Sequence, residues 1–301
     1  MLLGYSVAFP RLGIVIEQLN KSFEIGGFRI AYYGVLIGLG ILAGILMVSK
    51  VAKAAGQDVE IYYDCALYAI IASLIGARIY YVIFEWEYYK DNLLSIFKLR
   101  EGGMAIYGAV IAAVITLYIY ARKKKLSFGL LLDTGCLGLL VGQIVGRWGN
   151  FVNREAFGGY TDGLFAMQLK KSEVYSGYIT PELAENTVWV NGIEYIQVHP
   201  TFLYEALWNL GVLCLLLLYY HHKKYDGEVA CLYLIGYGLG RTWIEGLRTD
   251  QLMLGGFAVS QVLSVLLVIG AAGFVILKRK TLKKDTVSQN EKNLRHKTKV
   301  L

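Results

Sequence analysis

Two arginines lie in polar, glycine-rich segments of a chain that is otherwise strongly apolar. Arg147 stands in the segment 146–159, which reads GRWGNFVNREAFGG, and Arg241 stands in the segment 237–248, which reads YGLGRTWIEGLR. A guanidinium group is planar and can hold two phosphate oxygens at once, and the nearby asparagine amides add further hydrogen-bonding groups. The two segments therefore predict a phosphate-binding site.

The elements that would position these segments are apolar enough to cross a membrane. Hydrophobic residues make up 56% of the 301 residues and charged residues 18%, whereas soluble proteins carry about 45–50% and about 25%. A spanning helix needs about 20 mostly apolar residues, so we predict an all-α polytopic membrane protein with seven transmembrane helices. The sixth is the weakest, because Arg241 and Glu245 lie at its end. The predicted helices cover 30–49, 61–84, 104–121, 128–147, 202–220, 229–244 and 255–277.

Three of these helices share a pattern in which an acid is followed by an arginine about 14 residues later, a rise of roughly 20 Å. In a hydrocarbon core about 30 Å thick, the arginines would lie in the outer third, where the simplest anion is a phospholipid head group. A structural alternative is that the arginines pair with Glu205, Glu245 or helix carbonyls, or extend to the interface. The acids and arginines are Asp64 with Arg78, Asp133 with Arg147, and Glu228 with Arg241.

The distribution of basic residues predicts the orientation. The segment 278–301 contains nine Lys and Arg and two acids, which accounts for the net charge of +7. Basic residues collect on the cytoplasmic side, so we expect the N-terminus outside and the C-terminus inside. A basic tail on a neutral body argues against a nucleic-acid partner. The predicted regions are an extracytoplasmic arm (1–29), helices one to four (30–150), an extracytoplasmic head (151–198), helices five to seven (199–277) and a basic cytoplasmic tail (278–301).

The predicted head contains a hairpin signal. Asn191-Gly192 separates the apolar runs 187–190 and 193–196, and Asn-Gly is the strongest short sequence signal of a two-residue β-turn. We therefore expect a small head that contains a β-hairpin. The four cysteines all lie in apolar runs without the spacing of metal ligands, so we expect neither a metal nor a cofactor.

The two arginine segments resemble the signature of the prolipoprotein diacylglyceryl transferases, bacterial membrane enzymes of lipoprotein maturation. That signature reads Gly-Arg-x-Gly-Asn-Phe-hydrophobic-Asn-x-Glu with a nearby Gly, and it matches 146–158. The resemblance extends along almost the whole chain. The further matching positions are Tyr33-Gly34, Gly102-Gly103-Met104, Asp133, 199–205 and 237–248.

The resemblance implies transfer of the diacylglyceryl group from phosphatidylglycerol to the lipobox cysteine thiol in a prolipoprotein signal peptide, with release of glycerol phosphate. The site would face the extracytoplasmic side of the bacterial plasma membrane, in contact with the lipid bilayer. By the same resemblance, Arg147 and Asn150 bind the head group and Arg241 assists departure of the phosphate. Glu155, Glu245 and Tyr237 orient them, although the glutamates could instead only neutralise the arginines. The remaining substrate-binding positions are Tyr33, Asn153 and Gly158.

The sequence departs from the family pattern at one position. Tyr107 stands where many members have a histidine proposed to deprotonate the cysteine. An unperturbed tyrosine has a pKa of about 10 and is a poor base at neutral pH. His199 is the other titratable candidate, so the base stays open between these two residues.

A rival class is an anion or lipid transporter that uses intramembrane arginines. Arginines on one side of the membrane, rather than at its midplane, and the lack of proline-broken helices disfavour that class. An intramembrane protease is disfavoured by the lack of a Ser-His or paired-Asp arrangement at membrane depth.

Overall fold

The computed structural model describes residues 4–98 and 102–300. It divides into two compact units that share the long helices α1 and α5. The first unit holds the residues up to Gly44, Leu139–Lys224 and those from Glu228 onward. The second holds Ile45–Gly138 and Tyr225–Gly227.

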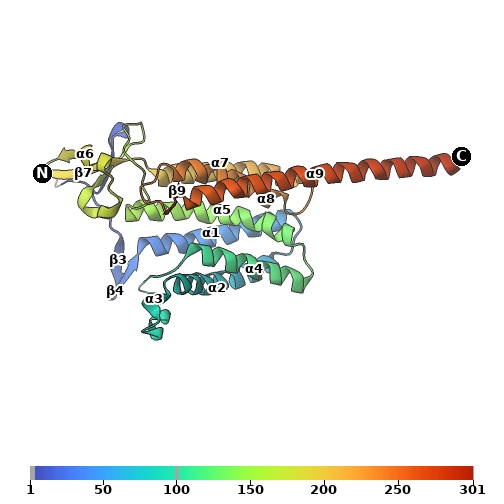
Figure 1. Cartoon of the computed structure of the whole chain (residues 1–301), viewed down its shortest axis with the longest axis horizontal. Coiled ribbons are helices and arrows are strands. Elements are labelled where there is room, and N and C mark those ends of the chain that lie inside the picture. The colour runs from blue at the N-terminus through green and yellow to red at the C-terminus, as the bar shows by residue number, and fades with distance from the viewer. Residues whose placement is uncertain (1–3, 99–101, 301) are drawn as a thin grey trace. The chain divides into compact units, whose positions relative to one another are not determined.

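Long helices form most of the chain (Figure 1). Six of them, in the described residues, are long and apolar enough to cross a membrane, which identifies a mostly helical polytopic membrane protein. Helix α8 (Glu228–Glu245) is not among the six, because its 18 residues include Glu228, Arg241 and Glu245. The seventh span therefore stays a prediction. The six are α1 (Tyr32–Ala54), α2 (Val59–Phe84), α4 (Ile106–Lys124), α5 (Phe128–Asn153), α7 (Thr201–Tyr219) and α9 (Val259–Val300).

Two helices extend furthest beyond their predicted ends. Helix α5 continues past Arg147 to Asn153, so the first arginine segment begins in its last turns. Helix α9 continues through the basic segment to Val300. That segment contains neither proline nor glycine, the residues that most strongly end a helix.

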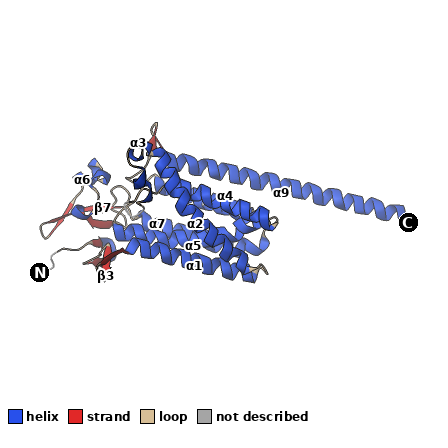
Figure 2. Ribbon diagram, turned by 90° about the horizontal axis from the view of Figure 1, so that it is seen from below, coloured by secondary structure: helices blue, strands red, loops and turns tan. Residues whose placement is uncertain are grey.

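A five-stranded antiparallel sheet forms the core of the head, in the strand order β2-β1-β5-β7-β6. Figure 2 shows its strands in red at the end of the first unit where α7 begins. The sequence predicted only the β6–β7 hairpin, whose turn residues Asn191 and Gly192 have the expected positive φ of 53° and 77°. The strands are β1 (Val7–Phe9), β2 (Ile14–Ile16), β5 (Met167–Lys170), β6 (Val188–Val190) and β7 (Ile193–Val198).

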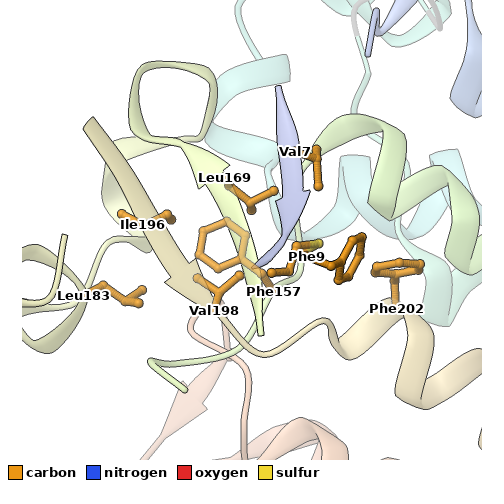
Figure 3. Close-up of a cluster of buried hydrophobic side chains, with 9 residues drawn as sticks. Val7, Phe9, Phe157, Leu169, Leu183, Ile196, Val198 and Phe202 are labelled. Carbon is orange, nitrogen blue, oxygen red and sulfur yellow. The ribbon is translucent and has the colours of Figure 1, made fainter. Parts of the chain in front are cut away.

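The N-terminal residues complete this sheet and its hydrophobic core. Strand β1 pairs with both β2 and β5, and Val7 and Phe9 pack against Phe157 in one buried cluster (Figure 3). Phe202, in the first turn of α7, joins the same cluster. The core therefore fixes the sheet against the beginning of α7.

Two small hairpins lead directly into long helices of the first unit. Strands β3 (Ser22–Ile25) and β4 (Phe28–Ala31) precede α1. Strands β8 (Met253–Leu254) and β9 (Phe257–Ala258) precede α9. Short helices, α3 (Trp86–Tyr89) and α6 (Pro181–Glu185), lie in connections.

Candidate active site

A buried carboxylate on α7 joins the two arginines that the sequence singled out. The side chain of Glu205 is only 4% exposed. Its Oε2 atom lies 2.6 Å from Nη2 of Arg147 on α5, and its Oε1 atom lies 3.2 Å from Nη1 of Arg241 on α8. Three helices of one unit thus bring two guanidinium groups to a single carboxylate.

A second acid and a third arginine extend this cluster. Glu245 follows Arg241 by one helical turn, and its Oε2 atom lies 2.5 Å from Arg241 Nη2. Nη1 of Arg248 lies 3.8 Å from Glu245 and 3.9 Å from Glu205. Arg248 also donates two hydrogen bonds, of 2.8 and 2.7 Å, to the carboxylate of Asp250.

The acids keep Arg248 charged in spite of its burial. Burial by itself lowers the pKa of this guanidinium. The hydrogen bond from Arg248 to Asp250 and the charges of Asp250, Glu245 and Glu205 outweigh that effect and raise the pKa overall. The three arginines and three acids therefore form a compact network whose formal charges cancel.

The network remains partly open to a ligand. The side chain of Arg147 is 19% exposed and that of Arg241 is 16% exposed. Carboxylates hold the two guanidinium groups in place while part of each arginine side chain stays accessible. An incoming phosphate would thus meet donors that are already oriented.

The end of α5 adds a polar chain to Arg147. Nη1 of Arg147 lies 3.4 Å from Oδ1 of Asn150, and Nδ2 of Asn150 donates a 3.0 Å hydrogen bond to Glu155. Arg154 and Ala156 both have a positive φ of 55°, which reverses the chain after the helix. The backbone NH of Glu155 consequently returns to the carbonyl of Asn150 at 3.1 Å.

Tyr33, predicted as a site residue, lies against the same helix. A Cβ atom placed on Gly149 would lie 2.5 Å from Cδ2 of Tyr33 and 2.8 Å from its Cε2. The ring therefore occupies the space that any larger residue at position 149 would need, two residues from Arg147. The close packing of Tyr33 therefore explains why the Gly-Asn-Phe motif has glycine at position 149.

Gly158 brings three segments of the site together. Its backbone NH donates to the carbonyl of His199 at 3.0 Å, and it forms an isolated β-bridge with Arg248. A Cβ atom at this position would lie 2.7 Å from Cβ of His199 and 2.9 Å from the carbonyl oxygen of Leu247. Only glycine fits there without moving one of these segments.

Replacing Gly158 with alanine is expected to displace the Arg248 segment. Overpacking of this kind costs about 1–3 kcal/mol, so we expect a lower melting temperature and slower turnover in the Gly158→Ala protein. Gly159→Ala is the matched control, because a Cβ atom there meets nothing within 4 Å. Equal melting temperatures for the two variants would contradict this packing role.

His199 is held by its backbone and by one aromatic neighbour. Its Nδ1 atom lies 3.2 Å from the hydroxyl of Tyr204, and its backbone NH donates to Gly159 at 3.0 Å. Burial lowers the pKa of its imidazole, so the ring is neutral at neutral pH. A neutral imidazole is able to accept a proton.

The other predicted site residues have separate surroundings. Tyr107 lies in the first turn of α4, in the second unit, with its ring 6.4 Å from that of Tyr80. Tyr237 stacks on Tyr233 at 5.7 Å. Asn153 is the last residue of α5. The catalytic or binding roles of these three residues stay predictions.

The structural alternative explains the third arginine of the repeated pattern. Arg78 is 6% exposed, and its guanidinium lies 5.2 Å from the ring of Tyr89. It donates four hydrogen bonds of 2.7–2.8 Å to main-chain carbonyls, so it holds the connection between α2 and α4. These carbonyls belong to Ser95, Ile96, Gly102 and Gly103.

Three residues of the network were not on the predicted list of site residues. Glu205 was considered only as a counter-ion, and Arg248 only as the end of a motif; Asp250 was not considered. The sequence does contain a signal for Arg248, because it follows Glu245 by three residues near the end of a helix. Nothing local identifies Glu205 as the carboxylate shared by helices far apart in the chain.

Comparison with known proteins gives a consistent match. A family model described as prolipoprotein diacylglyceryl transferase matches residues 20–277. Proteins named phosphatidylglycerol–prolipoprotein diacylglyceryl transferase from Halalkalibacterium halodurans and Listeria welshimeri are each 43% identical to this chain. The first alignment covers 85% of this chain and 86% of the relative, and the second covers 89% and 93%. A protein of the same name from Bacillus cytotoxicus is 39% identical, over 91% of this chain and 97% of its own.

Proposed function

The chain belongs to the prolipoprotein diacylglyceryl transferase family, and we propose that it transfers the diacylglyceryl group of phosphatidylglycerol to the lipobox cysteine thiol of prolipoproteins. The observation that carries this proposal is the carboxylate of Glu205, which orients both Arg147 and Arg241. The cysteine sulfur attacks the carbon of the diacylglyceryl group that bears the phosphate. A carbon–sulfur bond forms, the carbon–oxygen bond breaks, and its electron pair leaves with glycerol phosphate.

The proposed work of the arginines is electrostatic. As the carbon–oxygen bond breaks, the phosphate gains negative charge, and donors fixed in advance stabilise that charge at no cost of reorientation. Glu205 and Glu245 hold Arg241, while Glu205 and Asn150 hold Arg147. In this account Arg147 binds the head group and Arg241 assists departure. Tyr33, Asn153, Glu155, Gly158 and Tyr237 complete the substrate-binding positions.

Of the two candidate bases, His199 suits the chemistry better than Tyr107. The pKa of His199 lies below its ordinary value because of burial, so the imidazole is free to take the thiol proton at neutral pH. A tyrosine is protonated at this pH unless its pKa is strongly lowered. The thiol has a pKa of about 8.5 and needs only modest help.

This choice of base predicts a pH profile. Protonation of His199 at acidic pH removes the base, so activity in the wild type should fall as the pH drops below the ordinary histidine value of about 6.5. His199→Gln is expected to lower kcat/KM and to abolish this acidic limb, whereas Tyr107→Phe is expected to keep it. The profile is measured from pH 5 to pH 8. An acidic limb that survives in His199→Gln would reject the histidine.

We also propose the topology that the composition suggests, with α8 as the seventh span, the head (151–198) outside and the basic segment (278–301) inside a bacterial plasma membrane. Helix α8 packs against α7 and α9, and its charges are paired within the protein. Glu228 accepts a 2.6 Å hydrogen bond from Arg279, and Arg241 pairs with Glu205 and Glu245. Pairing of this kind lowers the cost of charges at membrane depth.

Mass spectrometry tests the activity directly. Purified protein is incubated with phosphatidylglycerol and a peptide that contains a lipobox cysteine. The expected product is the peptide with a diacylglyceryl thioether on the cysteine, together with free glycerol phosphate. Uptake of a labelled anion into protein-containing vesicles, without any thioether, would instead support the transporter class.

A further inference from the structure

Two hairpins of the first unit share an unusual tip. The β3–β4 turn reads Ile25-Gly26-Gly27-Phe28, and the β8–β9 turn reads Leu254-Gly255-Gly256-Phe257. All four glycines have a positive φ, between 56° and 85°, which suits a tight two-residue turn. Because the turn residues are both glycine, neither tip carries a polar side chain.

The side chains that flank these glycines are among the most exposed hydrophobic groups of the chain. Ile25 and Phe28 are 61% and 67% exposed, and Leu254 and Phe257 are 76% and 70% exposed. An exposed apolar patch marks a surface that contacts lipid or another partner. The two tips therefore need an apolar partner.

The neighbouring helices identify that partner. β4 ends at Ala31 and α1 begins at Tyr32, while β9 ends at Ala258 and α9 begins at Val259. Counted from these first residues, the first basic residues are Lys50 in α1 and Lys278 in α9, a rise of roughly 27–29 Å in each. This matches a hydrocarbon core of about 30 Å. Each hairpin therefore directly precedes a helical segment of membrane length, and β3, β4 and β9 lie at the end of the first unit that carries the head (Figure 1).

Each hairpin also adjoins a residue of the candidate active site. Tyr33 lies in the first turn of α1, directly after β4. Arg248 precedes β8, and Gln251 in between donates a 2.9 Å hydrogen bond to the carbonyl of Arg248. The glycine turns therefore lie six residues before Tyr33 and seven residues after Arg248 in the chain.

We infer that the apolar tips of β3–β4 and β8–β9 insert into the leaflet on the side of the head and contact the acyl chains of phospholipids, including those of the lipid whose phosphate the arginines bind. The identity of the lipid substrate rests on the proposed function, and the depth of the tips in the membrane rests on the lengths of α1 and α9. The tips would set the height of the lipid, so that its phosphate lies level with Arg147 and Arg241.

Spin labelling tests the insertion without any need for transfer activity. Labels are attached in Phe28→Cys and Phe257→Cys, in the full chain with Cys214→Ser and Cys231→Ser, reconstituted in vesicles of phosphatidylglycerol and phosphatidylcholine. Trp189→Cys is the matched control, because Trp189 is 65% exposed on the β6–β7 hairpin of the head. Tip labels should collide more with oxygen than with a water-soluble nickel chelate, and the control label should do the reverse.

Three results would overturn the inference. Tip labels that collide with the chelate as often as the control label does would place the tips in water. Spin–spin broadening that disappears on dilution with unlabelled protein would make a second copy the partner. If the tip labels are protected from the nickel chelate only after the lipobox peptide is added, the tips bind the precursor protein instead of lipid.

Kinetics test the link to the substrate. Phe28→Asp and Phe257→Asp should raise KM for vesicle phosphatidylglycerol about tenfold with little change in kcat, whereas Phe→Leu at the same positions should have little effect. With a water-soluble short-chain phosphatidylglycerol, the Asp variants should match the wild type. Phe→Ser replaces any Asp variant that is not monodisperse. An unchanged KM with vesicles would contradict the contact between the tips and the substrate lipid. If the spin labels show that the tips are in the membrane but the wild type transfers no lipid, only the proposed function is refuted.

Discussion

Arg147→Lys and Arg241→Lys are each expected to lower the rate of thioether formation by about 10²–10³, the usual effect of removing one donor to a developing anion. Lysine keeps the positive charge but loses the planar fork that holds two oxygens at once. In this site the fork has a second task, since each guanidinium also contacts Glu205. An ammonium group cannot make both contacts in the same geometry.

Arg11→Lys is the matched control, because it replaces an arginine outside the candidate active site. Arg11 lies between strands β1 and β2, and its side chain is 54% exposed and forms a 2.7 Å ion pair with Asp162. Arg11→Lys should leave the transfer rate unchanged. The rate is measured by mass spectrometry of the peptide product. Wild-type turnover in either lysine variant would mean that the guanidinium group of that arginine is not used in the reaction.

Glu205→Ala is expected to damage both stability and activity. Removing one partner of a buried ion pair leaves an uncompensated charge and costs about 3–5 kcal/mol. Here the single carboxylate serves Arg147, Arg241 and, at 3.9 Å, Arg248. We therefore expect a clear fall in the melting temperature in detergent together with loss of transfer.

Glu205→Gln distinguishes the two consequences. Glutamine retains the size and one acceptor oxygen but not the charge, so we expect it to recover part of the stability and little of the activity. Thermal unfolding and product formation are measured on the same preparations. If Glu205→Ala melts at the wild-type temperature, the carboxylate is not the centre of the network.

Local sequence signals predicted the helices and the head hairpin well, because each depends on neighbouring residues. Hydrophobic runs placed all six candidate spans to within a few residues at most ends, and Asn191-Gly192 located the β6–β7 turn. The exceptions have physical causes. α9 continues because no helix-breaking residue follows Lys278, and α8 carries charges that only its partners within the protein neutralise.

Long-range pairings could not be predicted in the same way. Strand β1 is three residues long and pairs with β5, whose residues come far later in the chain, so no local pattern indicates the contact. The contacts of Glu205 with Arg147 and Arg241 also join segments that are far apart in the chain, so no local pattern indicates them. Spacing predicted that the three arginines lie at a similar depth, but it gave no sign that one carboxylate joins two of them while Arg78 binds carbonyls.

The most direct test of the account is whether Arg147 and Arg241 bind the phosphate of the lipid. Binding of short-chain phosphatidylglycerol and of the matching diacylglycerol, which lacks the phosphate, is measured for the wild type and for Arg147→Ala/Arg241→Ala. We expect the wild type to prefer phosphatidylglycerol and the double variant to bind both lipids equally weakly. A double variant that still prefers phosphatidylglycerol as strongly as the wild type does would contradict it.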